Sequence, residues 1–139
     1  MEKTNIFKNC KIRIKSTLQK KVILLKNKVI KRVKKNSGEE IWLKNDKDYC
    51  MKILIVKEGY QGSTHKHVLK AESFFIVKGW LKLEMKGKTL FLNPGDWVHI
   101  PRNTYHRMTG LTHTEILECS TKHSDKDVYR KTKSGKVSE

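Results

Sequence analysis

The stretch GYQGSTHKHVLKAE, residues 59–72, holds two histidines one residue apart and, after four more residues, a glutamate. On a β-strand, side chains at positions i and i+2 point to the same face, so His65 and His67 can chelate one ion. A turn can bring Glu72 to them, and His106 follows a turn-rich segment further along. Three imidazoles and one carboxylate suit Zn, Fe, Mn, Co or Ni and leave positions open for water or substrate. Taken alone, an HxH pair in a loop also fits two solvated histidines.

Short apolar runs separated by turn residues fill the chain from about residue 39 onward, a pattern typical of an all-β domain. Residues 80–85 alternate apolar and polar side chains as a half-buried strand does. The predicted strands are 40–43, 50–56, 73–77, 80–85, 89–92, 97–100, 105–108 and 115–119. Many short strands at this spacing predict a sandwich or a barrel, and closure of a barrel removes exposed edges.

The length of 139 residues fits one domain, which we place at 36–130. Residues 1–35 are the most basic part and are predicted to be an N-terminal extension. Apolar residues recur there at the spacing of one helical face, but the run 21–25 fits a strand equally well. A basic amphipathic helix would suit a membrane surface, and the alternative is packing on the domain or on a dimer partner. Residues 131–139 are predicted to be a disordered tail.

Composition limits the class of protein. The net charge of +17 comes from lysines spread through nearly every segment, without a nucleic-acid-binding motif, so we predict no specific nucleic-acid partner. Such a charge favours small phosphorylated ligands by electrostatic steering. No apolar run is long enough to span a bilayer, and the N-terminus lacks the features of a secretory signal, so we expect a cytoplasmic protein. Three separated cysteines predict reduced thiols rather than disulfides.

Two longer motifs enclose the candidate ligands. The first runs from Gly59 through His65, His67 and Glu72 to Gly79, and the second runs from Gly95 through Pro101 and Asn103 to His106. Their order and spacing resemble the two motifs of the cupin superfamily over about residues 50 to 120. This resemblance implies a small double-stranded β-helix barrel, jelly-roll-like, with one divalent metal inside one end. Asn103 stands where the family usually has glycine, and asparagine tolerates the left-handed backbone that such a turn needs.

A narrower resemblance is to the cupin domain of type II mannose-6-phosphate isomerase and to related sugar isomerase cupins of surface-polysaccharide gene sets. It is carried by residues 40–54, 63–67, 116–118 and 120–130. Residues 35–38 depart from it, because they read Lys-Asn-Ser-Gly where the relatives carry Lys-Pro-Trp-Gly. The resemblance implies an isomerase or epimerase of a sugar or sugar phosphate, in which the metal stabilises an enediol while a proton moves between adjacent carbons.

The same resemblance implies roles for several charged residues. Glu118 would be the general base, with Glu115 as the second candidate. Arg130 and Arg107 would hold a phosphate or a hydroxyl-rich substrate through their fork-shaped donors. Asp127 would orient Arg130.

Other side chains near the motifs have two interpretations each. Tyr105, beside His106, is either a proton donor or a core residue, and His123 is either a pocket residue or an ordinary histidine of the tail. Lys66 and Lys70 flank the candidate ligands and would add positive charge to the site, but we interpret them as solvated side chains of a lysine-rich chain. The three tryptophans are expected to pack between sheets.

Two other functions fit the same ligand set. Three histidines and one glutamate also suit iron or nickel in a metal-dependent dioxygenase. The third possibility is a cupin that binds a sugar or a metal without catalysis. We expect a homodimer in each case, because cupins often pair through strand edges and N-terminal segments.

Overall fold

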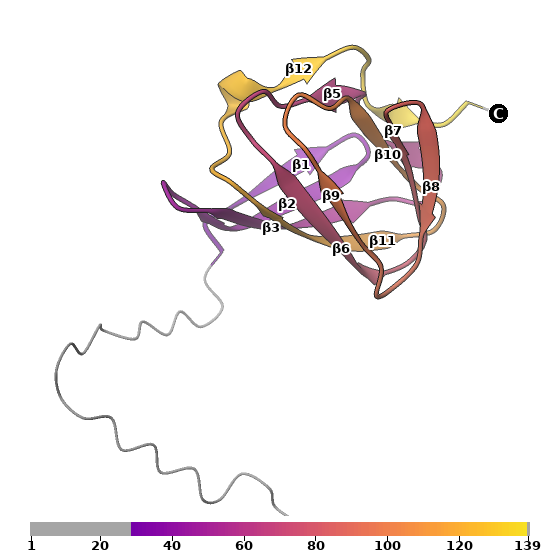
Figure 1. The fold of residues 1–139 in the computed structure, drawn as a ribbon. Coiled ribbons are helices and arrows are strands. Elements are labelled where there is room, and N and C mark those ends of the chain that lie inside the picture. The colour runs from indigo at the N-terminus through magenta and orange to yellow at the C-terminus, as the bar shows by residue number, and fades with distance from the viewer. Residues whose placement is uncertain (1–28, 139) are drawn as a thin grey trace, which may run out of the picture.

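The computed structural model describes residues 29–138, which are built almost wholly from β-strands (Figure 1). The strands are β1 Lys31–Lys35, β2 Gly38–Asn45, β3 Cys50–Val56, β4 Tyr60–Gln61, β5 His65–Lys66, β6 Glu72–Lys78, β7 Leu81–Met85, β8 Lys88–Leu92, β9 Trp97–Ile100, β10 His106–Gly110, β11 Thr114–Ser120, β12 Tyr129–Arg130 and β13 Gly135–Lys136. A short 3-10 helix, Asp125–Asp127, precedes β12. The all-β prediction is confirmed.

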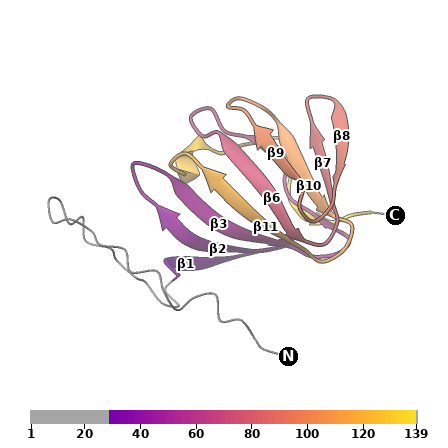
Figure 2. The ribbon, with the colours of Figure 1, turned by 60° about the horizontal axis from the view of Figure 1, so that its bottom comes forward.

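The strands form two antiparallel sheets. The first sheet has the order β1-β2-β3-β11-β6-β9, and the second has the order β12-β5-β10-β4-β13, with β7 pairing to β10 and β8 pairing to β7. Figure 2 shows the strands of the first sheet fanned beside one another, with β10, β7 and β8 of the second sheet beyond β9. Some neighbouring strands, such as β3 with β11 and β5 with β10, come from distant parts of the sequence, so the site residues of different motifs meet inside the barrel.

Inward-facing residues change from apolar to charged along strands β3 and β11. The register places Leu54 of β3 opposite Ile116 of β11, and both belong to the apolar core. Two residues further along the same strands, Lys52 lies opposite Glu118, and both side chains are buried. The core cluster consists of Leu54, Val56, Phe74, Ile76, Leu81, Leu83, Ile100 and Ile116. The core therefore fills one part of the barrel, and charged side chains occupy the adjoining part.

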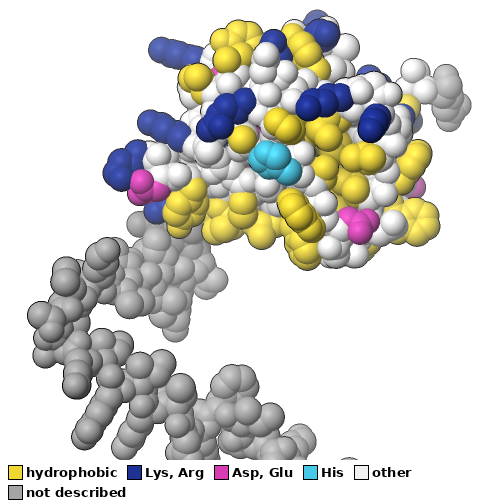
Figure 3. Space-filling view, in the orientation of Figure 1, with side chains coloured by type: hydrophobic (Ala, Val, Ile, Leu, Met, Phe, Trp, Pro, Cys, Tyr) yellow, Lys and Arg dark blue, Asp and Glu magenta, His cyan; other side chains and the backbone are white. Residues whose placement is uncertain are grey.

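The outer face of the first sheet carries exposed apolar side chains. Phe75 of β6 pairs with Trp97 of β9, and their exposed fractions are 44% and 70%. Figure 3 shows hydrophobic side chains gathered on this face of the molecule, with lysines and arginines beside them. The expectation that the tryptophans pack between sheets was wrong for Trp97 and for Trp80, which is 57% exposed. Of the three, only Trp42 is buried. The homodimer stays a prediction.

The segments at both ends of the predicted domain join the sheets. β1, within the predicted extension 1–35, pairs with β2 as a hairpin, while residues 1–28 lie outside the described part. The tail differs from the disorder expected for 131–139, because β13 pairs with β4 and Val137 N–H donates to the Gly59 carbonyl at 2.8 Å. A polar, lysine-rich sequence gives no sign of such edge pairing. Within residues 29–138, no helix has the length and apolar character needed to cross a membrane.

Two turn glycines, Gly79 and Gly87, provide a test of how closely the chain packs at the turns. Gly79 and Gly87 have φ values of 79° and 71°, so alanine at either position is strained. A Cβ on Gly79 would lie 2.2 Å from the carbonyl oxygen of His113, whereas a Cβ on Gly87 would meet nothing within 4 Å. We expect Gly87→Ala to lower the free energy of unfolding by about 1 kcal/mol and Gly79→Ala by about 2–4 kcal/mol. Urea denaturation measures both, and equal losses would contradict the close approach at Gly79.

Candidate functional site

The four candidate ligands converge inside the barrel. The pairing of β10 with β5 sets His106 opposite His65, with ring centroids 4.5 Å apart. The ring of His67 lies 5.1 Å from that of His65 and 6.3 Å from that of His106. Glu72 Oε2 lies 3.3 Å from His106 Nε2 and 3.7 Å from His67 Nε2. The structure therefore brings together the residues of both sequence motifs.

Each of the three imidazoles is held through its Nδ1 atom by a backbone carbonyl. His65 Nδ1 lies 3.0 Å from the Ser63 carbonyl oxygen, and His67 Nδ1 lies 2.7 Å from that of Asp127. His106 Nδ1 lies 3.0 Å from the carbonyl oxygen of Thr104. A carbonyl only accepts hydrogen bonds, so each Nδ1 carries the proton and each Nε2 keeps its lone pair. This is the tautomer that a metal ligand needs.

The donor set fits a divalent cation. Glu72 Oε2 and His106 Nε2 are buried, have no hydrogen-bond partner in the described structure, and face each other. Two unpartnered lone pairs at this distance need a cation or a proton between them. Within residues 29–138, no three His, Cys, Asp or Glu side chains lie close enough together to form a complete metal centre. The ring centroids of His67 and His106, for example, are 6.3 Å apart. The fit rests on the types and directions of the donors.

A buried lysine adjoins the candidate ligands. Lys70 Nζ donates to Glu72 Oε1 at 2.5 Å and to Glu118 Oε1 at 2.8 Å, and the three side chains are only 2–4% exposed. Burial alone would lower the pKa of Lys70, but the carboxylates of Glu118 and Glu72 outweigh it and raise the pKa. Burial alone would likewise raise the pKa of Glu72, but the Lys70 ammonium outweighs it and keeps that pKa low. Lys70 is therefore an ammonium and Glu72 a carboxylate at neutral pH.

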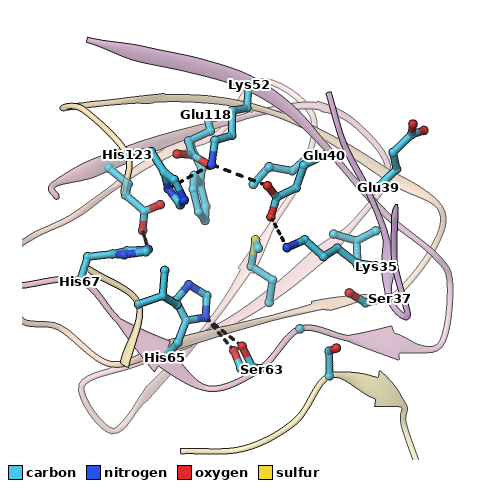
Figure 4. Close-up of a pocket in the computed structure, with 18 of the residues that line it drawn as sticks. Lys35, Ser37, Glu39, Glu40, Lys52, Ser63, His65, His67, Glu118 and His123 are labelled. Carbon is cyan, nitrogen blue, oxygen red and sulfur yellow. Dashed lines mark hydrogen bonds and ion pairs between the residues drawn. The ribbon is translucent and has the colours of Figure 1, made fainter. Parts of the chain in front are cut away.

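A pocket opens beside this cluster, with a cavity volume of about 140 Å³. Figure 4 shows Lys52, Glu40 and His123 joined by polar contacts on one side, with His65 facing them across the pocket. Lys52 Nζ lies 3.2 Å from His123 Nδ1 and 3.7 Å from Glu40 Oε2. Because an ammonium only donates, His123 Nδ1 accepts, and His123 Nε2 donates to Asp125 Oδ1 at 3.1 Å. Charged groups thus line two sides of the pocket.

The histidines of the pocket are neutral at neutral pH. Burial and then the neighbouring His106 lower the pKa of His65 to about 3. Burial and then the positive charge of Lys52 lower the pKa of His123 to about 4. Burial also lowers the pKa of His67. Neutral imidazoles keep the lone pairs that bind metals and accept hydrogen bonds.

The structure brings two of the three predicted catalytic residues to the pocket. Glu118 lines it and is buried, and Arg130 lines it from an exposed position on β12. Tyr105 does not line it, because its ring lies along a separate hollow, where the ammonium of Lys131 sits 3.9 Å from the ring centroid. The interpretation of Tyr105 as a proton donor is therefore not supported by its position.

Three other predicted roles differ from the structure. Asp127 does not orient Arg130: its carboxylate accepts hydrogen bonds from the backbone N–H groups of residues 68, 69 and 70. Arg107 forms a two-pronged ion pair with Glu84, at 2.8 and 3.1 Å, outside the pocket. Glu115, the second candidate base, faces outward beside His113.

Sequence reasoning missed the two buried lysines. Lys70 was interpreted as solvated, and its exposed fraction is 2%. Lys52 was not considered, although it lies on the inward face of β3, where buried and half-buried residues alternate. That alternation is visible in the sequence, since Cys50, Lys52, Leu54 and Val56 occupy every second position. This alternation could have predicted that the Lys52 side chain points into the barrel.

Comparison with known proteins identifies similar chains. Residues 52–119 match the family model described as Cupin domain. The chain is 35% identical over 57 residues to quercetin 2,3-dioxygenase of Bacillus subtilis (strain 168), a match that covers 39% of this chain and 17% of that protein. The matched family region contains all four candidate ligands and Glu118, but not His123 or Arg130.

Solved structures resemble the fold. KdgF from Halomonas sp. superposes with a TM-score of 0.59 at 20% identity, over 63% of this chain and 81% of its own. The capsular polysaccharide assembling protein CapF from Staphylococcus aureus gives 0.65 at 18% identity, over 74% of this chain and 34% of its own. The nucleoside dehydratase Pac13 superposes with a TM-score of 0.65 at 14% identity, over 78% of this chain and 87% of its own. At these identities the likeness concerns the fold.

His123 makes the stability depend on pH. Its pKa is about 4 in the folded protein and 6.5 in the unfolded chain, so the unfolded chain binds more protons between these values. Stability is therefore full above pH 6.5 and falls as the pH drops toward 4, with His123 contributing up to about 3 kcal/mol. We expect His123→Gln to flatten this decline in urea denaturation from about pH 7 to about pH 4.5. His113→Gln, at an exposed histidine, is the control; an unchanged slope in His123→Gln would contradict the burial of His123.

Proposed function

We propose that the chain is a metal-dependent isomerase or epimerase of a small sugar or sugar phosphate, on the premise that residues 52–119, which match the Cupin domain family model, form a cupin domain. The observation that carries this proposal is the buried pair of Glu118 and Lys70 beside the cluster of metal-type donors. A carboxylate held in a pocket next to a Lewis-acid site is the arrangement that proton abstraction beside a carbonyl requires.

We propose that one divalent ion of the group Zn, Mn, Fe, Co or Ni is held by His65, His67, Glu72 and His106. The bound ion would supply Lewis-acid stabilisation of the negative charge that develops on oxygen in an enediolate. The protein prepares this site by fixing the three imidazoles in the tautomer with a free Nε2.

Glu118 is the proposed general base. Both described donors to its carboxylate, Lys70 and Ser120, use Oε1 at 2.8 and 3.1 Å, which leaves Oε2 to accept a proton. Lys70 also holds the carboxylate in one orientation, so little rearrangement is needed before proton transfer. Glu118 could return the proton to the adjacent carbon of the same substrate, which is what an isomerase or epimerase needs.

The pocket lining suits a hydroxyl-rich ligand. It offers donors in Lys52 and Arg130 and acceptors in Glu40 and Glu118, and a sugar hydroxyl both donates and accepts. Arg130, which lines the pocket from an exposed position, would pair with a phosphate or carboxylate of the substrate. The volume of about 140 Å³ lies below the roughly 300 Å³ at which pockets for drug-sized ligands begin, so the ligand is small.

A dioxygenase is the second candidate. It is favoured by the 35% identity with quercetin 2,3-dioxygenase, although the chain spans only 17% of that protein. The charged lining speaks against a large apolar substrate, because such a substrate would shield Lys52 and Glu40 from water without offering either of them a hydrogen bond. Iron content with substrate-dependent oxygen uptake would favour this candidate over the isomerase. A cupin that binds sugar without catalysis would retain metal but exchange no substrate protons with solvent.

Metal content tests the ligand set. We expect His65→Ala and His106→Ala to lose most of the bound metal, because each removes one of four donors. Mass spectrometry of protein purified without a metal-affinity column, with divalent ions added back, gives the stoichiometry. His113→Ala, at an exposed histidine outside the pocket, is the control and should keep the wild-type content. Unchanged metal in both site variants would overturn the assignment.

Isotope exchange tests the general base. We expect Glu118→Gln, assayed with the divalent metal in saturating excess so that the site stays occupied, to slow any exchange of substrate C–H for solvent deuterium by about 10²–10⁴-fold. The matched control is Glu115→Gln on the same strand, whose side chain faces outward. Nuclear magnetic resonance in D2O with a panel of aldose and ketose phosphates measures the exchange. Equal rates in Glu118→Gln and wild type would place the base elsewhere.

A further inference from the structure

The charge of Lys70 lies in the same cluster that would hold a metal ion. We propose that Lys70 is a built-in counter-ion that competes with the metal for the charge of Glu72, and so sets an upper limit on the affinity for divalent cations. This inference rests on the proposed metal site and concerns how tightly that site binds, rather than which reaction it supports.

The two oxygens of Glu72 serve different partners. Oε1 accepts a hydrogen bond from Lys70 Nζ at 2.5 Å, while Oε2 faces His106 Nε2 at 3.3 Å and His67 Nε2 at 3.7 Å. Glu72 therefore offers only Oε2 to a metal. The ammonium of Lys70, bound to Oε1, draws negative charge away from Oε2. Lys70 thus both orients Glu72 and weakens it as a ligand.

Lys70 also has a second anionic partner. Its Nζ lies 2.8 Å from Glu118 Oε1, so one ammonium is shared between two buried carboxylates. The three side chains together carry one net negative charge. Two carboxylates without the ammonium would be strongly destabilised in this buried position, because unpaired buried charges lose their hydration. Lys70 therefore allows the cluster to form in the metal-free protein.

The position of Lys70 is fixed by its backbone. The N–H groups of Val68, Leu69 and Lys70 all donate to the carboxylate of Asp127, at 2.9–3.1 Å. The backbone carbonyl of Asp127 accepts from His67 Nδ1 at 2.7 Å. One residue thus holds both the loop that carries Lys70 and a candidate ligand. The ammonium is a permanent part of the cluster rather than a surface side chain folded inward.

Electrostatics predicts opposite effects for the two partners of this ion pair. A positive charge a few ångströms from a divalent cation repels it, and the repulsion is large where solvent is excluded. Removing Lys70 therefore strengthens metal binding, provided that the protein folds. Removing the charge of Glu118 weakens metal binding, because the whole ammonium charge then acts on Glu72.

The test measures metal affinity in the full-length chain by competition with a chromophoric chelator, with Zn²⁺ and Mn²⁺ in separate titrations. We expect Lys70→Met to bind each ion at least about tenfold more tightly than wild type, and Glu118→Gln to bind it at least about tenfold more weakly. Lys88→Met, which removes an exposed lysine of β8, is the matched control and should bind as wild type does. Equal or weaker binding by a folded Lys70→Met would overturn the inference.

Thermal melting supplies an independent readout. We expect metal-free Lys70→Met to melt at a lower temperature than metal-free wild type, and added metal to raise its melting temperature by more than it raises that of wild type. If Lys70→Met does not fold, the double variant Lys70→Met/Glu118→Gln, which removes one charge of each sign, takes its place and should bind each ion more tightly than Glu118→Gln does; equal or weaker binding would overturn the inference. Absence of binding in wild type, together with no effect of His65→Ala, would refute the metal site itself. Normal binding in wild type with no change in these variants would refute only the role of Lys70.

Discussion

The burial of opposite charges inside a small barrel is the constraint on which the site depends. Glu72, Glu118 and Lys70 have side chains that are 2–4% exposed, and the cost of removing such groups from water is several kcal/mol per ion. This cost is offset only where oppositely charged side chains lie within hydrogen-bond distance of one another. The register of β11 with β3 and β6 fixes Glu118 beside the loop that carries Lys70. The apolar core, by contrast, needs no such matching, since its contacts are not directional.

The strands and the His65–His67 pair could be predicted because both depend on local patterns, whereas the barrel and the addition of His106 to the cluster were implied by the resemblance of two motifs to the cupin superfamily. Alternation over residues 50–56 and 80–85 appears as strands β3 and β7. The i, i+2 spacing of His65 and His67 places two imidazoles within 5.1 Å of each other. Asn103 has a φ of 58°, which confirms that asparagine adopts the left-handed turn expected at that position. Each of these features follows from residues that are close in the sequence.

The charge network could not be predicted in the same way, because it depends on which strands pair. In a chain with 31 lysines and arginines, an ammonium inside the barrel looks in sequence like the others on the surface. Lys70 is buried because Asp127, 57 residues away, holds the loop around it. The tail pairs with β4 through backbone hydrogen bonds, which leave no mark on side-chain composition. Tyr105 is next to a candidate ligand in sequence, but its ring points to another hollow.

The two lysines of the pocket distinguish this site from one made by histidines and carboxylates alone. Lys70 joins the candidate ligand Glu72 to the proposed base, and Lys52 joins His123 to Glu40 on another side. Because each ammonium is already paired, neither adds a free positive charge that would bind any anion. The pocket instead presents alternating donors and acceptors around a small volume. On the proposed function, such a lining would discriminate by the positions of hydroxyl groups rather than by net charge, because a ligand that lacks one would cover polar groups of the pocket without offering them a hydrogen bond.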